Sequence, residues 1–199
     1  GVDMPFLDSQ LVEQYNLLDV RADFEGKLDL SGIDVIVIAG PTQPVTQGEM
    51  DQLDEFFARG GRGLILVDST IADTRRFVAR ANADNFNDFI LRYGVFVHEN
   101  IVMDSESHDT LSFTTATGSI LLPYPFWVKA PTVETKISGN TESILLPWAG
   151  SIELDETPDI SAVDSFIPLV QSTDAGVLRW EYQDIEPQPE LSAYGREGD

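Results

Sequence analysis

The sequence contains no cysteine. Disulfides, thiolate nucleophiles and cysteine-ligated zinc sites are therefore excluded. No apolar run approaches the roughly 18 residues that a membrane-spanning helix needs, and no basic segment followed by an apolar one marks a signal peptide. Because the chain opens at Gly1 without an initiator methionine, we expect an excised fragment whose parent protein carries any membrane segment.

Positive charge is also scarce. The 199 residues include 12 Lys and Arg against 34 Asp and Glu, which gives a net charge of −22. A surface of this kind repels phosphate backbones and anionic lipid headgroups, so we predict no nucleic-acid binding. The hydrophobic fraction of 42% is that of a folded globular protein rather than a disordered one.

The clearest local pattern is a strand, a helix and a second strand. A β-branched run over residues 34–39 and a second apolar run over 64–67 have the character of strands buried on both faces. Between them, Thr46 and Glu49 have the spacing of a capping box that starts a helix, and Gly60-Gly61 predicts its end.

The pattern continues with a helical stripe over residues 86–93 and a third strand over 100–104. Strands alternating with helices through short links predict an α/β fold, namely a Rossmann-like parallel sheet with helices on both faces. From residue 105 the chain is rich in Thr, Ser, Ile, Val and Pro, which predicts a β-rich extension whose proline-broken strands are edge or bulged strands.

These elements define the expected domain organisation. We predict one domain over residues 1–183, with an α/β core at about 17–104 and the β-rich extension at about 105–183. The polar segment 184–199 is expected to be a flexible tail.

In a parallel sheet, ligands bind beyond the carboxyl ends of the strands. This rule predicts a ligand crevice at three strand ends, formed by Gly40, Pro41, Thr42, Asp68, Ser69, Thr70 and Asp104. Asp68 and Asp104 could together hold Mg²⁺ or Ca²⁺, but turn formation and helix capping are the commoner roles of such residues, so we expect no metal and no cofactor.

Two further chemistries bear on the function, namely nucleophile- or nucleotide-dependent hydrolysis and sugar binding. There is no Gly-x-Ser-x-Gly elbow and no phosphate-binding Gly-x-x-x-x-Gly-Lys-Ser/Thr loop. The aromatic residues of the second half could form a sugar-stacking surface, although core packing is the commoner use; they are Tyr124, Phe126, Trp127, Trp148 and Trp180.

Several motifs together resemble a known family. Its pattern is a strand running into Gly-Pro, a helix with a capping Thr/Ser-x-x-Glu, a Gly-Gly stop, and a strand ending at Asp. The matching residues here are Ala39-Gly40-Pro41, Thr46 to Glu49, Leu53-Asp54, Gly60-Gly61 and Leu64 to Asp68, continued by Arg92 to Val95 and Asn100 to Asp104. The chain thereby resembles, over about residues 5–181, the auxiliary components of bacterial ABC transporters, including gliding-motility-associated, substrate-binding-like subunits.

The resemblance implies a soluble, periplasmic or otherwise extracytoplasmic domain of a membrane-tethered parent, with permease and ATPase subunits of the same system as partners. It also implies a fold like that of class I glutamine amidotransferases, with intraflagellar-transport GIFT domains as distant relatives. Amidotransferase catalysis needs a cysteine, which this chain lacks.

We therefore expect a non-catalytic domain, not an enzyme, that binds a ligand or a partner protein in an export or gliding-type system. A metal-dependent hydrolase and a carbohydrate-binding module remain the alternatives.

Overall fold

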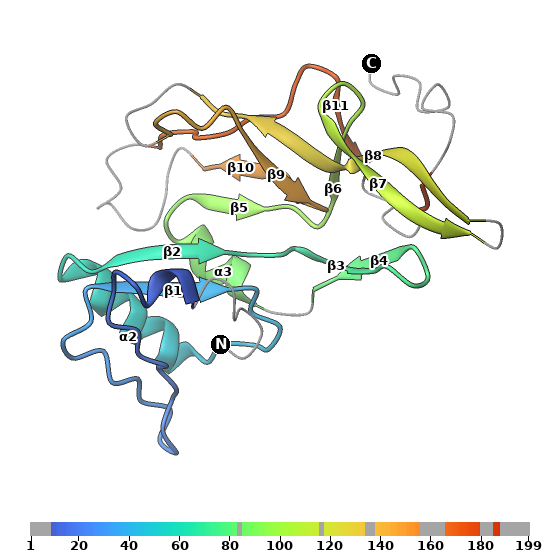
Figure 1. Ribbon diagram of the computed structural model, residues 1–199. Coiled ribbons are helices and arrows are strands. Elements are labelled where there is room, and N and C mark those ends of the chain that lie inside the picture. Colours follow the sequence, from blue (N-terminus) through green and yellow to red (C-terminus); the bar gives the residue numbers. More distant parts are fainter. Residues whose placement is uncertain are drawn as a thin grey trace. The chain divides into compact units, whose positions relative to one another are not determined.

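The computed structural model describes residues 9–82, 85–115, 118–133, 138–155, 166–179 and 185–187 (Figure 1). The chain divides into two compact units. The first unit comprises Gly1–Val67 and Ala83–Phe89, and the second comprises Asp68–Asn82 and Ile90–Asp199. The single domain expected over residues 1–183 stays a prediction.

The first unit is built on a short parallel sheet. Strands β1 (Val35–Ala39) and β2 (Arg62–Leu66) pair in parallel, with Val35 opposite Arg62 and Ala39 opposite Leu66. Helix α2 (Gln47–Ala58) connects them and lies along one face of the pair (Figure 1). The predicted strand–helix–strand unit is therefore confirmed.

Both ends of α2 follow from local sequence chemistry. Thr46 Oγ1 accepts the amide of Glu49 at 3.3 Å, and Glu49 Oε2 accepts the amide of Thr46 at 2.8 Å, so the predicted capping box is present. At the other end Gly60 adopts φ = 91°, a left-handed conformation that glycine reaches without a Cβ clash. The predicted stop of the helix is confirmed.

The inner face of the sheet packs closely on the helix. Met50, Leu53 and Phe56 of α2 are buried. A Cβ on Gly61 would overlap the ring of Phe56, and a Cβ on Gly63 would lie 2.9 Å from the ring of Phe57. The two glycines therefore let the β2 backbone approach the aromatic rings of the helix.

The second unit consists mainly of antiparallel strands. Hairpin β3 (Thr70–Asp73) and β4 (Val78–Ala81) comes first, and helix α3 (Phe86–Leu91) then crosses the division between the units. Strand β5 (Val95–Val97) pairs with β10 (Ile152–Leu154), and β6 (Ile101–Asp104) pairs with β11 (Gly176–Arg179). The largest sheet has the order β7 (His108–Thr115), β8 (Gly118–Pro131), β9 (Ser143–Pro147).

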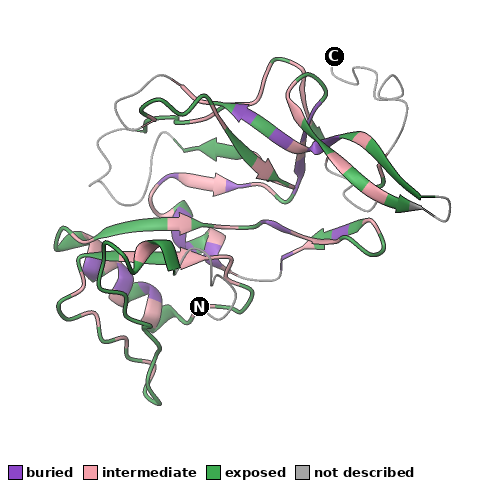
Figure 2. Cartoon of the chain, viewed as in Figure 1, coloured by how far each residue is buried: buried purple, intermediate pink, exposed green. Residues whose placement is uncertain are grey.

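The prediction of a Rossmann-like parallel sheet with helices on both faces is wrong. Among the described strands only β1 and β2 run parallel, and β6, expected as a third parallel strand, pairs antiparallel with β11. On the face of β1–β2 opposite α2, four aliphatic side chains are between 43% and 49% exposed, and Figure 2 shows most of β2 as exposed. A β-branched run identifies a strand, but it contains no information on the direction of the strand's neighbour.

The prolines of β8 were expected in edge or bulged strands. β8 is instead the central strand of its sheet. The bulge is confirmed, because His108 pairs with Val128 whereas Asp109 pairs with Tyr124, so that Pro125 falls within the register shift. Strand β9 pairs with Trp127–Pro131, a stretch that starts within that shift and continues past it.

The core of the second unit draws on distant parts of the chain. Its buried members are Ala79, Ile101, Met103, Tyr124, Phe126 and Ile185. Ile185 is only 1% exposed, although it lies in the segment 184–199 that the sequence assigns to a flexible tail. Apart from residues 185–187, that segment lies outside the described residues.

Candidate functional site

The predicted crevice residues divide between the two units. Gly40, Pro41 and Thr42 belong to the first unit, and the others belong to the second. Gly40 continues the parallel ladder, since its amide donates to the carbonyl of Leu66 at 2.8 Å. Pro41 is half-buried, and Thr42 is exposed.

A side chain that the sequence analysis did not single out holds the loop after Thr42. Asn85 Oδ1 accepts the amide of Val45 at 2.7 Å, and Asn85 Nδ2 donates to the carbonyl of Val45 at 2.9 Å. These two hydrogen bonds fix the backbone of Val45, the residue before the helix N-cap. An asparagine outside any motif gives no signal in a single sequence.

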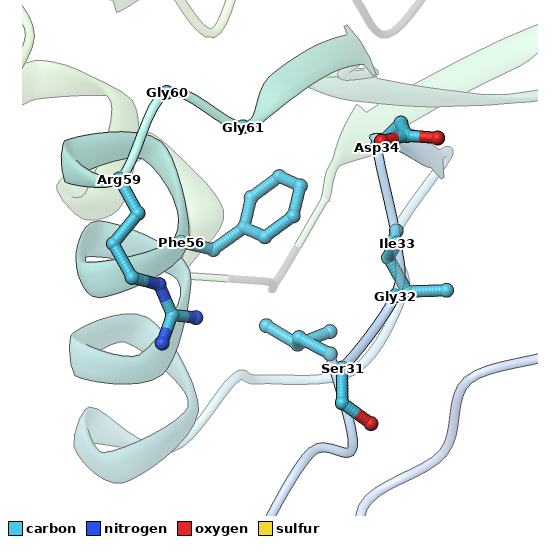
Figure 3. A pocket seen from close by; sticks show the side chains of 9 residues that line it. Ser31, Gly32, Ile33, Asp34, Phe56, Arg59, Gly60 and Gly61 are labelled. Carbon is cyan, nitrogen blue, oxygen red and sulfur yellow. The ribbon is translucent and has the colours of Figure 1, made fainter.

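A shallow pocket of the first unit lies at the other end of its strands, where β1 and β2 begin (Figure 3). Its volume is about 380 Å³, and it is lined by Leu30, Ser31, Gly32, Ile33, Asp34, Phe56, Arg59, Gly60 and Gly61. The Phe56 ring fills the space between α2 and the segment before β1, whereas the Arg59 guanidinium and the Asp34 carboxylate point away from each other (Figure 3). The charged groups therefore do not converge on a common ligand position.

In the second unit Asp104 is fully buried at the end of β6. Its Oδ1 accepts the amides of Glu106 at 3.0 Å and Ser107 at 2.9 Å, and its Oδ2 accepts the amide of Thr173 at 2.7 Å. The hydroxyl of Thr173 donates to the same carboxylate at 2.8 Å. Asp104 thus joins the turn after β6 to the segment before β11.

The electrostatics of Asp104 agree with this structural role. Burial acts to raise the pKa of the carboxyl, but the hydrogen bonds from Ser107, Thr173 and Glu106 outweigh it and hold the pKa below its usual range. The acceptor positions of the anion are occupied by protein donors. A cation at Asp104 would have to displace these bonds, and no group of three or more His, Asp or Glu among the described residues is arranged to hold a metal.

Ser69 and Thr70, at the start of the β3–β4 hairpin, are both buried. Their hydroxyl oxygens have no hydrogen-bond partner among the residues that the structure describes. The carbonyl groups of this segment are used for structure, since Asn82 donates to Ser69 O through its amide and to Asp68 O through Nδ2, both at 2.9 Å. The Asp68 side chain is exposed.

The aromatic residues of the second half form a packed cluster. Trp127 and Trp148 meet edge to face, with ring centroids 5.4 Å apart and planes at 87°. Trp148 Nε1 donates to the hydroxyl of Tyr124, which in turn donates to the carbonyl of Ile185 at 2.8 Å. Rings held at right angles do not form the flat platform on which a sugar stacks, and Trp180 lies outside the described residues.

The comparison with protein families accounts for nearly the whole chain. The model of the family described as "ABC-type uncharacterized transport system", an ABC transporter auxiliary family, matches residues 6–197. The chain belongs to this family. The predicted family is therefore confirmed, and a transport-associated role follows from it, whereas the amidotransferase-like detail of the fold is not supported.

Among solved structures, this ABC transporter auxiliary domain is similar to the N-terminal domain of mmIFT52. The TM-score is 0.55 at 17% sequence identity, and the match covers 77% of this chain and 65% of that one. Likeness at this identity shows a shared fold alone. No curated protein sequence matches the chain.

Proposed function

We propose that this domain is a non-catalytic, extracytoplasmic part of an ABC transport system that binds a partner protein of that system. The family match supports the transport role. In the absence of converging chemical groups in the described residues, the surface of the domain rather than an active site is the basis for the proposal.

The observation that carries the proposal is the open face of the parallel sheet. Four large aliphatic side chains lie on the face opposite α2, namely Val35, Val37, Leu64 and Leu66, each between 43% and 49% exposed. Parallel strands usually have both faces covered. Contiguous exposed apolar residues on a folded surface are typical of protein interaction sites.

The hydrogen bonding of Asp104 and the composition of the chain support the same conclusion. Asp104, the best candidate for an acid, base or metal ligand, makes four hydrogen bonds to its own chain. The sequence also offers no cysteine as a nucleophile. Both features favour binding over chemistry.

The experiment is co-purification of the full-length protein with the permease and ATPase subunits of the proposed transport system, followed by native mass spectrometry. The double variant Val37→Asp/Leu64→Asp places charge on the open sheet face, and we expect it to abolish the complex. Leu121→Asp is the matched control, because Leu121 is 72% exposed in the second unit. Loss of the complex with both variants, or with neither, contradicts the proposed surface.

The extracytoplasmic location is tested separately. No helix among the described residues is long and apolar enough to cross a membrane. Reporter fusions to the full-length protein, active only on one side of the membrane, should place this domain outside the cytoplasm. A cytoplasmic signal would refute the location without affecting the binding role.

A further inference from the structure

The turn of the β3–β4 hairpin concentrates positive charge in a strongly acidic chain. Residues 74–80 read Thr-Arg-Arg-Phe-Val-Ala-Arg, so 3 of the 12 Lys and Arg residues fall within six consecutive positions without a carboxylate among them. We call Arg75, Arg76 and Arg80 the hairpin arginines. All three are exposed.

Within the described part of the chain, the hairpin arginines make little contact with the protein's own acids. Arg75 makes no side-chain hydrogen bond or ion pair with any described residue, and Arg80 donates only to the carbonyl of Ala81 at 3.3 Å. Arg76 is 3.9 Å from the Asp73 carboxylate, with 80% of its side chain exposed. An exposed contact at this distance contributes little, so the described residues leave most of the guanidinium donors for another molecule.

The turn is held in a strained conformation. Phe77 has φ = 53°, in the left-handed region that a bulky side chain rarely adopts. Its ring packs 5.9 Å from that of Phe113, and its carbonyl accepts the amide of Ile185 at 2.9 Å. The amides of Arg75 and Arg76 both donate to Asp73 Oδ1. The backbone that carries two of the arginines is therefore fixed before any partner binds.

The exposed face of the hairpin adds an apolar contact. Val78 and Arg80 alternate with buried Ala79, so they share the outward face, and Val78 is 38% exposed. A rigid turn with guanidinium forks around an aliphatic side chain matches a polypeptide that carries carboxylates, since arginine binds a carboxylate through two parallel hydrogen bonds.

We propose that the hairpin arginines form a docking site for an acidic protein segment. A bilayer of anionic lipids would have to approach the whole molecule and its net charge of −22, whereas a single peptide segment can reach the hairpin alone. At physiological ionic strength charges are screened beyond about 8 Å, so the local arginines determine the attraction of a slender ligand. Three cations are also fewer than the four to eight basic residues that typically recognise anionic lipids. The site goes beyond the proposed function and does not depend on it.

The test measures binding of a fluorescent peptide of alternating glutamate and serine to the protein at about 0.15 M salt by anisotropy. A peptide with glutamine in place of glutamate is the neutral probe. Removing the hairpin arginines with Arg75→Gln/Arg76→Gln/Arg80→Gln should weaken binding of the acidic peptide about tenfold, the sum of three exposed charge pairs. Circular dichroism confirms that the variant remains folded.

The matched control is Lys27→Gln/Arg62→Gln/Lys129→Gln, which removes three exposed cations elsewhere and leaves the same net charge. This control variant should change the affinity for the acidic peptide by less than about threefold. Equal loss in both variants, equal affinity for the neutral peptide, or no peptide binding would overturn the proposal. So would binding to vesicles containing phosphatidylserine in place of the peptide. Complex formation with the transporter subunits is a separate readout, so failure here is distinguishable from failure of the proposed function.

Discussion

The two units of this chain reach their folds in different ways. In the first unit one helix covers one face of two parallel strands, and the other face keeps its aliphatic side chains exposed. In the second unit antiparallel strands enclose a core in which Tyr124, Phe126 and Ile185 are almost fully buried. The first unit thus leaves one face of its sheet open, whereas the second unit encloses its core.

Polar groups show the same contrast. In the first unit the capping-box hydrogen bonds of Thr46 and Glu49 are exposed, and Asn85, which bonds Val45 across 40 residues, is half-buried. In the second unit Asp104 bonds Thr173, and Asn100 and Ser151 exchange two bonds of 2.9 Å through Asn100 Nδ2 and the amide of Ser151. A buried polar group that bridges distant segments destabilises the fold when its partner is lost. We therefore expect mutations of polar residues to have larger effects in the second unit.

The largest effect should come from Asp104→Ala. The substitution leaves three amides and one hydroxyl, all in part-buried hydrogen bonds, without an acceptor, so the free energy of unfolding should fall by about 3–5 kcal/mol in urea titrations. Asp174→Ala is the matched control, because Asp174 is exposed in the neighbouring turn and should change stability by less than about 0.5 kcal/mol. Similar losses in the two variants would mean that the Asp104 network contributes little.

The contribution of Asp104 should also depend on pH. Because its pKa is lowered in the folded state, its stabilisation is complete above the ordinary aspartate value of about 3.9 and is lost as the pH falls through the lower folded-state value. The difference in unfolding free energy between wild type and Asp104→Ala should therefore shrink below about pH 4. A difference that grows on acidification would show that the folded-state pKa is raised instead.

The next largest effect is expected for Ile185→Ala. The truncation opens a cavity in the core of the second unit, and the unfolding free energy should fall by about 3 kcal/mol. Leu121→Ala, at a position that is 72% exposed, should be nearly neutral in the same titration. A neutral result for Ile185→Ala would show that this residue is not part of the core in solution.

A pair of glycines at either end of α2 should respond with opposite signs. Gly60→Ala forces a Cβ into the left-handed conformation at φ = 91°, which should destabilise the first unit by about 1–2 kcal/mol. Gly48→Ala lies in the first turn, where an added Cβ would meet no atom within 4 Å, and it should stabilise the unit by about 0.5 kcal/mol. Thermal unfolding distinguishes the two, and losses of the same sign would refute the assigned backbone conformations.

The smallest effect is expected on the open sheet face. Val37→Thr keeps the shape of a side chain that is 44% exposed, so stability should change by less than about 0.5 kcal/mol. Val128→Thr makes the same change at a position that is 3% exposed and should cost about 1.5 kcal/mol, because it buries a hydroxyl. Equal losses would indicate that the face around Val37 is covered.

Local chemistry explains how much of this fold could be predicted. The helix start at Thr46, its stop at Gly60 and the two strands it connects depend on neighbouring residues, and the structure confirms them. The prediction that β6 continues the parallel sheet is wrong. Met103 instead pairs with Val177, in a strand that lies far along the chain. A strand pattern alone does not determine which neighbour it selects.

The candidate site was harder to predict for a related reason. The sequence marks Asp104 as a strand-end carboxylate, a feature shared by ligand sites and by structural turns. Only the position of Thr173, which bonds it from 69 residues away, shows that it is committed to structure. The roles of Asn85 and Ile185 likewise arise from partners that no local pattern reveals.

Ile185 is buried between Phe77 and Tyr124, and its late place in the sequence affects the order in which the two units can fold. A nascent chain emerges from the ribosome with its N-terminus first. The first unit has all its residues once position 89 has emerged, whereas the second unit must wait for position 185 before its core is complete. During that interval the strands of the second unit are exposed without their closing residue, and the acidity of the chain then keeps nascent copies apart.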